Sequence, residues 1–325
     1  MHDTTVGFHA SHEQVRPVAL RDAVVRAERA GFDSAMCSDH LAPWSATQGE
    51  SAFAFSWLGA ALQATQRLSM GQFHAPGQRY HPVISAQAAA TLAAMFPGRY
   101  TWMALGSGEL LNEHVTGQPW PRKTERMARL RECVDVMRAL WSGEEVSHDG
   151  RVTVDRARLW TLPDQPIALL GGAVSESTAA WTGGWADGLL TVNQDELTLE
   201  RLAGAYRENG GRGPLGMQVH LVYDEDTDRG VQTAVRQWRS NCLPNTLAWD
   251  LALPEQFEDA TRFVPVEEVR RAVLVVDHPG QLVEQLGRYV QLGYTRLYLH
   301  HVGVDQDAFI DMAGEHVLPQ VAVHS

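Results

Sequence analysis

The sequence predicts an α/β protein, an eight-stranded (β/α) barrel with insertions. Patterns typical of a buried strand and of an amphipathic helix alternate along almost the whole chain. No shift in composition, low-complexity segment or internal repeat divides its 325 residues, of which 44% are hydrophobic. We therefore expect a single domain over residues 1–325 rather than two.

Apolar spacing and helix-ending residues define the first four strand–helix pairs. Helix 17–30 has apolar residues at helical spacing and ends at Gly31, and helix 82–95 begins with proline, which is favoured in a first turn. The strands expected in this half are 6–9, 32–37, 68–73 and 100–105, and the helices are 17–30, 53–65, 82–95 and 122–141.

Two insertions interrupt the second half of the chain. Residues 146–161 carry alternating β-branched residues and an Asp149-Gly150 turn signal, which predict a hairpin, and residues 241–264 look irregular. We expect both insertions to lie over the mouth of the barrel. The other strands are expected at 166–170, 188–192, 217–223 and 296–299, and the other helices at 175–182, 197–209, 229–238, 266–270, 279–292 and 306–317. Together these elements make a TIM barrel with insertions.

Charge and composition exclude several classes of function. The net charge is −12 and no basic run exceeds a pair, so we expect no nucleic-acid partner. The three cysteines have no C-x-x-C spacing, which argues against structural zinc and disulfides. Apolar stretches end well before the ~20 residues of a membrane span. We expect a cytoplasmic protein that acts on a small molecule.

Polar side chains follow several of the predicted strands, where the chemistry of α/β barrels lies. His40 and Glu109 are the clearest acid–base pair among them. The alternative is that Asp39 and His40 cap the next helix and that Glu109 lies in a solvated loop. The full set is His9, His12, Glu13, Asp39, His40, Trp44, His74, Glu109, Asn112, Glu113, His300 and His301.

Other motifs are weaker signals. His9-x-x-His12-Glu13 lacks the His-Glu-x-x-His order and has no matching second ligand set, so we expect no metal site. The glycine loops 106–108 and 171–173 could approach a phosphate or could be simple turns. No G-x-G-x-x-G follows the first strand, so the sequence does not predict a Rossmann fold.

Several short motifs together carry a family resemblance. They are Ala10-Ser11-His12-Glu13-Gln14, Ser38-Asp39-His40-x-x-Pro43-Trp44, Phe55-Ser56-Trp57, Arg79-Tyr80-x-Pro82, Gly106-Ser107-Gly108-Glu109-x-Leu111-Asn112-Glu113 and Arg129-Leu130-Arg131-Glu132. Over essentially its whole length the chain resembles the luciferase-like flavin and deazaflavin oxidoreductases, which are barrels of this kind. It is most similar to the subgroup of the deazaflavin-dependent glucose-6-phosphate dehydrogenase, and residues 36–40 and 75–82 are similar to its FMN-using branch.

The resemblance implies a hydride transfer between an alcohol or carbonyl substrate and the cofactor ring. His40 would be the base that removes the hydroxyl proton. Trp44 would hold the developing anion, Glu109 would act as an acid at a ring nitrogen, and Glu13 would line the same pocket. A reduced-flavin-dependent monooxygenase and a non-catalytic flavin-binding barrel are the alternatives.

The resemblance also implies positions for the cofactor and the substrate. At residues 72–74 the superfamily often has a cis peptide behind the ring. The implied cofactor-binding residues are Asp39, Gln72, Phe73, His74, Ser107, Gly108, Asn112, Gly171, Gly172, Ala173 and Val174. The implied substrate-pocket residues are His12, Val192, Asn193 and His300. A homodimer is expected by resemblance alone.

Departures from the subgroup bear on substrate and cofactor. Where the sugar-phosphate enzymes have phosphate-binding lysines, this chain has residues 192–195, Val-Asn-Gln-Asp, and 258–260, Glu-Asp-Ala. We therefore expect a neutral substrate instead of glucose 6-phosphate, under an apolar roof that includes Leu243, Leu247, Trp249 and Phe257. Basic residues that could bind the oligoglutamate tail of a deazaflavin are scattered, which places FMN slightly ahead and the deazaflavin second.

Overall fold

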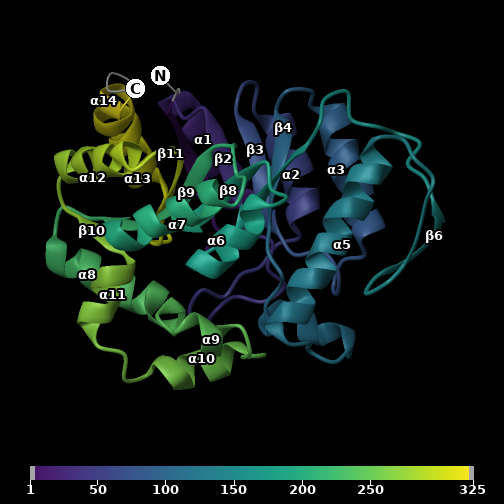
Figure 1. Cartoon of the computed structure of the whole chain (residues 1–325). Helices are drawn as coiled ribbons and strands as arrows, with labels where there is room; N and C mark the ends of the chain where they lie inside the picture. The colour runs from purple at the N-terminus through teal and green to yellow at the C-terminus, as the bar shows by residue number, and fades with distance from the viewer. Residues whose placement is uncertain (1–3, 322–325) are drawn as a thin grey trace.

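Eight parallel strands close into a barrel in the computed structural model, which describes residues 4–321 (Figure 1). Closure is made by the pairing of β8 with β9 and of β11 with β1. The TIM-barrel prediction is confirmed. In order around the barrel the strands are β1 (Thr5–Ala10), β2 (Ser34–Cys37), β3 (Ser69–His74), β4 (Tyr100–Leu105), β7 (Ala168–Gly172), β8 (Gly188–Val192), β9 (Leu215–Tyr223) and β11 (Tyr294–His301).

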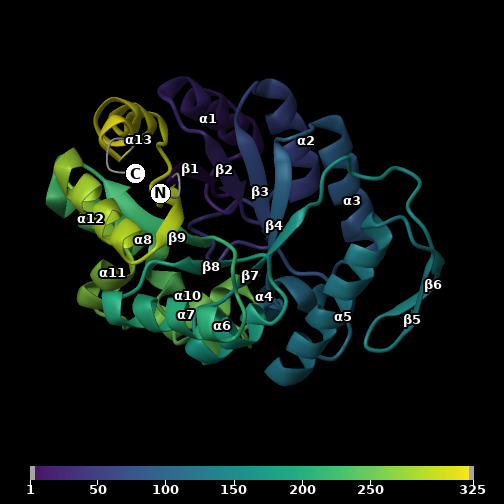
Figure 2. The ribbon, with the colours of Figure 1, turned by 45° about the horizontal axis from the view of Figure 1, so that its top comes forward.

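Helices surround the strands on the outside (Figures 1 and 2). Their boundaries agree with the predicted ones to within a few residues, and the first ends as expected at Gly31, which has a left-handed φ of 104°. The main helices are α1 (Pro17–Ala30), α2 (Ala54–Ala64), α3 (Pro82–Met95), α5 (Lys123–Trp141), α6 (Glu176–Gly183), α7 (Glu196–Glu208), α8 (Thr227–Trp238) and α12 (Pro279–Gln291). None of the described helices is both long enough and apolar enough to cross a membrane.

The last helix and one short strand differ from the prediction. The segment predicted as one helix over 306–317 consists of α13 (Asp307–Met312), a π-helical turn (Ala313–Val317) and α14 (Leu318–Val321). A Cβ on Gly314 would lie 2.6 Å from the carbonyl oxygen of Ala30, so this turn packs directly on α1. The short strand β10 (Leu274–Val276), which the sequence pattern did not reveal, pairs with β9 outside the barrel ring.

Large side chains fill the barrel below the carboxyl ends of its strands. A separate apolar cluster contains Met36, Trp102, Ala104, Leu170, Leu190 and Tyr298. Gly71 makes room for it, because a Cβ there would lie 2.3 Å from the Trp102 ring. This cluster fills the barrel below the carboxyl ends of its strands.

The first insertion forms a hairpin of β5 (Val146–Asp149) and β6 (Thr153–Ala157), as predicted, but it does not cover the mouth. Glu132 on α5 accepts a hydrogen bond from the Arg151 backbone N–H (2.6 Å) and lies 3.1 Å from His148 Nε2. These contacts hold the hairpin against the outer side of α5, at the edge of the molecule (Figures 1 and 2). The expectation that both insertions lie over the mouth is therefore wrong for this one.

The second insertion, residues 241–264, crosses the mouth, and we call it the roof segment. It contains α9 (Asn245–Ala248) and α10 (Pro254–Thr261), and α11 (Val266–Ala272) follows it. The predicted irregularity is thus only partial, because proline in the first turn and Gln256, which accepts from the Leu253 N–H (3.0 Å), start α10. The segment is tied to the β4 loop where the Trp249 carbonyl accepts from the Leu110 N–H (3.0 Å).

Candidate active site

A cavity of about 370 Å³ opens at the carboxyl ends of the barrel strands. Its walls come from the loops after β1, β2, β3, β4, β7 and β8, from β9 and β11, and from the roof segment. Of the apolar roof residues expected from the sequence, Leu243 and Trp249 line the cavity, Phe257 packs edge-on against Trp44 with ring centroids 5.1 Å apart, and Leu247 is exposed.

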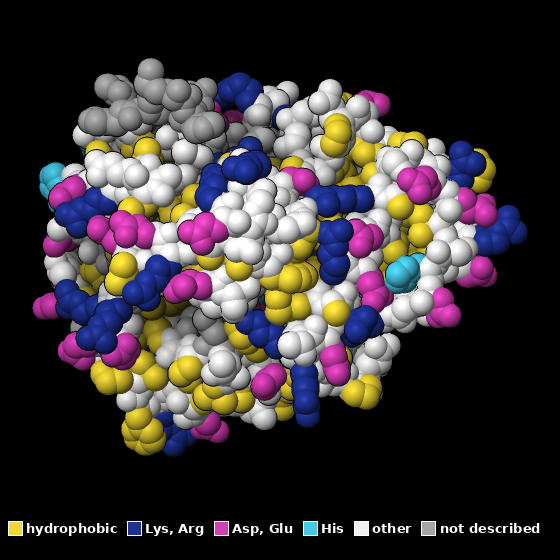
Figure 3. All heavy atoms as spheres, in the orientation of Figure 1, with side chains coloured by type: hydrophobic (Ala, Val, Ile, Leu, Met, Phe, Trp, Pro, Cys, Tyr) yellow, Lys and Arg dark blue, Asp and Glu magenta, His cyan; other side chains and the backbone are white. Residues whose placement is uncertain are grey.

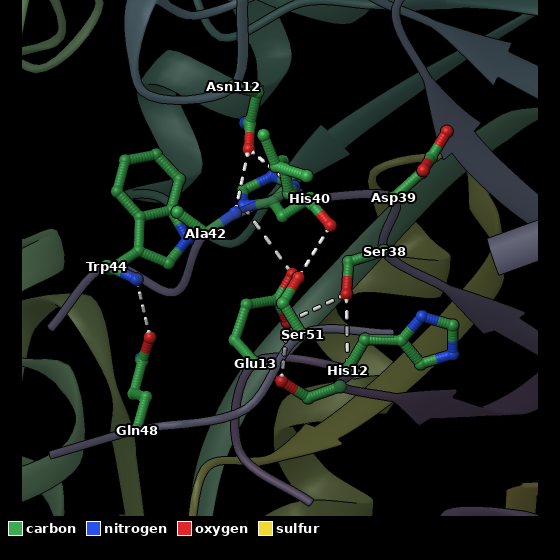
Figure 4. A network of polar contacts seen from close by, with 12 residues as sticks. His12, Glu13, Ser38, Asp39, His40, Ala42, Trp44, Gln48, Ser51 and Asn112 are labelled. Carbon is green, nitrogen blue, oxygen red and sulfur yellow. Dashed lines mark hydrogen bonds and ion pairs between the residues drawn. The ribbon is translucent and has the colours of Figure 1, made fainter. Parts of the chain in front are cut away.

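His40 lies at the centre of the polar wall of this cavity (Figure 4). Its Nδ1 is 3.5 Å from Glu13 Oε1, and its Nε2 is 3.8 Å from Glu109 Oε2. The Trp44 ring lies beside it, with centroids 5.2 Å apart. Four residues from the loops after β1, β2 and β4, which the resemblance marks as catalytic, therefore meet in one place.

Two serines hold Glu13 on one side of His40. Ser11 Oγ donates to Glu13 Oε2 (2.9 Å), and Ser38 Oγ donates to the same oxygen (2.7 Å). Burial opposes ionisation of this carboxyl, but His40 and the Ser38 hydrogen bond outweigh burial, so the pKa of Glu13 lies below its usual value. Glu13 is therefore a carboxylate that faces His40 Nδ1, which leaves Nε2 to act as a base.

Glu109 has the opposite protonation preference on the other side of His40. Burial raises its pKa, and the nearby Glu13 and Glu113 raise it further against the opposing effect of His40. One imidazole thus lies between an ionised carboxylate and a carboxyl group that retains its proton to higher pH. Such a difference in pKa between two carboxyl groups assigns Glu109 as the acid and Glu13 as the charged partner.

Asn112 connects the loops that carry His40 and Glu109. Its Oδ1 accepts a hydrogen bond from the Leu41 N–H (2.8 Å), and its own N–H donates to the Glu109 carbonyl (3.0 Å). Figure 4 shows the amide directed at the backbone after His40. Asn112 borders the cavity, as a cofactor-binding residue would, but its oxygen is already used to position the base.

Asp39 and His74 border the cavity, yet their polar groups bind protein. The Asp39 carboxylate accepts from Tyr80 Oη (2.9 Å) and lies 2.6 Å from His74 Nδ1, while His74 Nε2 is 2.8 Å from Ser85 Oγ. The carboxylate is directed away from His40 (Figure 4). These contacts fix the ends of β2 and β3 and leave only the outer surface of the two residues for a ligand.

The wall formed by β3, β4 and β7 is flat and rich in backbone. A Cβ on Gly172 would lie 2.3 Å from the Phe73 ring, so this glycine lets the ring lie flush against the strand. Next to it, Ser107, Gly108, Ala173 and Val174 line the cavity. The Ala173 N–H is already bonded to the Leu190 carbonyl (3.0 Å), which leaves Ser107, Gly108 and Val174 beside the ring surface, an arrangement that fits a flat cofactor with a phosphate.

Three implied site residues lie outside the cavity lining. Gln72 is fully buried and alternates away from Phe73, so its side chain is on the outer side of β3. Gly171 packs against α6, where a Cβ would lie 2.4 Å from Thr182. His12 is fully buried, with Nδ1 3.1 Å from the Ala52 carbonyl and its ring edge-on to Trp57.

The expected cis peptide at 72–74 is not found. No peptide bond within residues 4–321 is cis, and β3 stays in register with β4 through Phe73 and His74. The continuous ladder keeps this backbone in ordinary extended form.

The wall opposite Phe73 contains residues that sequence reasoning assigned and others that it missed. Val192, Asn193 and His300 border the cavity as expected. His9, which the sequence placed at the mouth, borders the cavity as well, whereas Trp238 on α8 and the strand residues Gln218 and His220 were missed. The signal for the last two is a pair of polar residues two apart in the otherwise apolar stretch Met217 to Tyr223, which puts both on one face of the strand.

The buried histidines make the fold sensitive to acid. Burial lowers the pKa of His9 and of His220 to about 3, from 6.5 in an unfolded chain. Between these values the unfolded chain binds more protons, so stability falls as pH falls, by up to about 1.4 kcal/mol per pH unit for each histidine. Denaturant unfolding measures how much of the free energy of unfolding is lost between pH 7 and pH 5. We expect His220→Phe to lose less than the wild type, and a variant of the exposed His316 to lose as much as the wild type. Equal losses in all three proteins would contradict this assignment.

Positive and negative side chains are mixed on the face of the molecule shown in Figure 3, where Lys and Arg are interspersed with Asp and Glu. In the cavity lining the cations are Arg79 and Lys123, and both have protein partners: Arg79 donates to the Asp39 carbonyl (2.6 Å), and Lys123 donates to Thr178 Oγ1 (3.1 Å).

Comparison with known proteins identifies the family. A protein-family model described as luciferase-like monooxygenase matches residues 2–296. F420-dependent glucose-6-phosphate dehydrogenases from Beutenbergia cavernae and Nakamurella multipartita are 36% and 35% identical, over 97% of this chain and 97% and 96% of theirs. A solved F420-dependent secondary alcohol dehydrogenase, in complex with an F420-acetone adduct, superimposes with a TM-score of 0.92 at 31% identity, covering 98% of this chain and 99% of that one. The chain belongs to the luciferase-like monooxygenase family, and it is an oxidoreductase.

Proposed function

We propose that this protein interconverts an uncharged alcohol and its carbonyl compound with a deazaflavin of the F420 type as the hydride carrier. The observation that carries the proposal is the position of His40 between Glu13, whose pKa is lowered, and Glu109, whose pKa is raised, at the wall of a cavity that also has a flat side formed by Phe73. A monooxygenase reaction with reduced flavin would not require this base.

The cofactor assignment is supported by the relatives. The dehydrogenases and the solved structure are named for F420, which is the second of the two cofactors left open by the sequence. Phe73 would lie against the ring, and the loop 107–108 together with Val174 would hold the phosphate. The ring of either cofactor would supply a two-electron hydride acceptor.

The side chains of this protein would handle the protons. His40 Nε2 takes the proton of the substrate hydroxyl, and Glu13 offsets the positive charge that results on the imidazole. Trp44 closes the side of the cavity next to the His40 ring, and Phe257 packs edge-on against Trp44 from behind. Glu109 keeps its own proton available on the other side of His40.

An uncharged substrate follows from the charge of the cavity. The two lining cations are already bound to protein groups, and Glu13 adds negative charge. The segments that differ from the sugar-phosphate enzymes supply carboxylates with structural partners: Asp195 accepts from the Thr198 N–H (3.0 Å) and Glu258 from the Ala46 N–H (2.8 Å). Among the described lining residues a phosphate would meet one cation without a carboxylate partner, Lys123, because Arg79 lies beside Asp39 and Glu113.

We expect kcat/KM for glucose 6-phosphate to be at least about 100-fold below that for a neutral secondary alcohol such as butan-2-ol, because charge-assisted contacts to phosphate are limited to Lys123. Steady-state reduction of the deazaflavin with each substrate measures this ratio. Comparable turnover of the phosphorylated sugar would overturn the assignment of the substrate class but not that of the base.

Absorbance titrations of the purified protein with F420 and with FMN test the cofactor assignment. We expect saturable binding of F420 and weaker binding of FMN. Binding of neither would contradict the proposed function, and oxygen consumption with reduced FMN but no alcohol oxidation would favour the monooxygenase. We also propose, by resemblance, that residues 1–325 form one domain that pairs as a cytoplasmic homodimer, and light scattering would test the dimer.

A further inference from the structure

Five histidines border the cavity, and they differ in whether their ring nitrogens are engaged. They are His9, His40, His74, His220 and His300. His74 uses both nitrogens, on Asp39 and Ser85. His300 also uses both: its Nε2 donates to Gln14 Oε1 (2.7 Å), and its Nδ1 accepts from Gln218 Nε2 (2.8 Å). Neither of these two rings has a nitrogen left for a ligand.

His9 and His40 are accounted for in other ways. His9 Nε2 lies 3.4 Å from Gln218 Nε2, and His9 Nδ1, which has no partner, is a buried atom. His40 has the position of the base. His220 is the one that remains: within residues 4–321 its ring nitrogens have no hydrogen-bond partner, and its side chain is 8% exposed where it borders the cavity.

His220 is held rigidly. Its ring packs against Trp238 with centroids 4.6 Å apart and against His300 at 5.4 Å. Its backbone N–H donates to Asn193 Oδ1 (2.8 Å), and Asn193 Nδ2 in turn donates to the Ala272 carbonyl (3.4 Å). A ring fixed on these sides presents its nitrogens in a defined direction and loses little freedom when it binds a ligand.

The position of His220 is on the substrate side of the cavity. β9 is four strands from β3 in either direction around the barrel, so His220 lies across the axis from the Phe73 wall. Val192, Leu243 and Ala272 border the cavity with it and are apolar. A neutral imidazole offers one N–H donor and one nitrogen acceptor, which matches a hydroxyl or a carbonyl group and not an anion.

We infer that His220 is a specificity-determining residue which binds a second, uncharged oxygen group of the substrate, so that the substrate class is an alcohol with another hydroxyl or carbonyl group. This inference rests on the proposed function, because it places the reacting hydroxyl at His40. The apolar neighbours then enclose the carbon chain between the two oxygen groups.

The test compares butane-1,3-diol with butan-2-ol, which share a carbon skeleton, in the F420-loaded protein. We expect the wild type to prefer the diol by at least about tenfold in kcat/KM, and His220→Phe, which keeps the ring and removes its nitrogens, to lose about tenfold of that preference. His220→Gln should restore part of it. The matched control is His301→Phe, since His301 is equally buried but stacks on Phe309 outside the cavity lining.

The outcomes separate the inference from the function on which it rests. Oxidation of neither alcohol by the wild type would overturn both. Oxidation of butan-2-ol with no preference for the diol, or a preference that His220→Phe and His220→Gln leave unchanged, would overturn the inference alone. If His220→Phe does not fold, His220→Gln decides, because it must still change the ratio of the two substrates while His301→Phe does not.

Discussion

Replacing His40 by alanine should lower kcat for alcohol oxidation by about 10²–10⁴-fold, the usual contribution of a general base. The imidazole lies between Glu13, one oxygen of which is held by Ser11 and Ser38, and Glu109, whose pKa is raised by burial. Stopped-flow or steady-state reduction of F420 by butan-2-ol measures the loss.

Cofactor affinity should change little in the same variant, because His40 is on the β2 loop and the flat wall is built from β3, β4 and β7. Absorbance titration gives the Kd for F420, which we expect to stay within about threefold of the wild type. His316→Ala, at an exposed position far along the chain, is the matched control. A collapse of affinity with His40→Ala would mean that the residue is structural, and retention of a tenth of the activity would exclude it as the base.

Replacing Glu109 by glutamine should lower kcat by about 10²-fold or more and should also change the pH profile. Burial raises the pKa of Glu109, so the protonated form that the mechanism needs is populated below that pKa and lost as pH rises through it. The wild type should therefore lose activity on the alkaline side. Glutamine keeps the shape of the side chain but cannot ionise, so the residual activity of the variant should lack this alkaline limb.

We expect kcat between pH 5 and pH 10 to show whether Glu109 acts as the acid or only lines a solvated loop. The proteins to compare are the wild type, Glu109→Gln and the exposed control Glu144→Gln. An alkaline limb that persists unchanged in Glu109→Gln would show that another group titrates. Full activity in this variant would mean that Glu109 only lines a solvated loop.

Local sequence patterns were sufficient for most elements of the fold. Pro82 and Gly31 mark a helix start and a helix end through their own backbone preferences, and those preferences act without any tertiary contact. Strand β10 was missed because it is only three residues long and pairs with β9 at the outside of the ring. The hairpin was predicted, but its location was not, because the contact that places it is between Glu132 and Arg151, and no local pattern records it.

The candidate site, like the fold, was predicted in part from the sequence and decided in part by tertiary contacts. By itself the sequence determined that Glu13, His40 with Trp44, and Glu109 follow three different strands of one barrel, and barrel geometry alone directs such residues to one mouth. Only the tertiary structure decided that Phe73 faces the cavity while Gln72 faces the helices, and that Asp39 is directed toward His74 and Tyr80 instead of the cavity. It also decided that among residues 4–321 the ring nitrogens of His220, inside a strand, have no hydrogen-bond partner, whereas both ring nitrogens of its neighbour His300 are engaged. The reason is physical: strand order and residue type fix which end of the barrel a side chain occupies, whereas its partners depend on packing between segments that are distant in the chain.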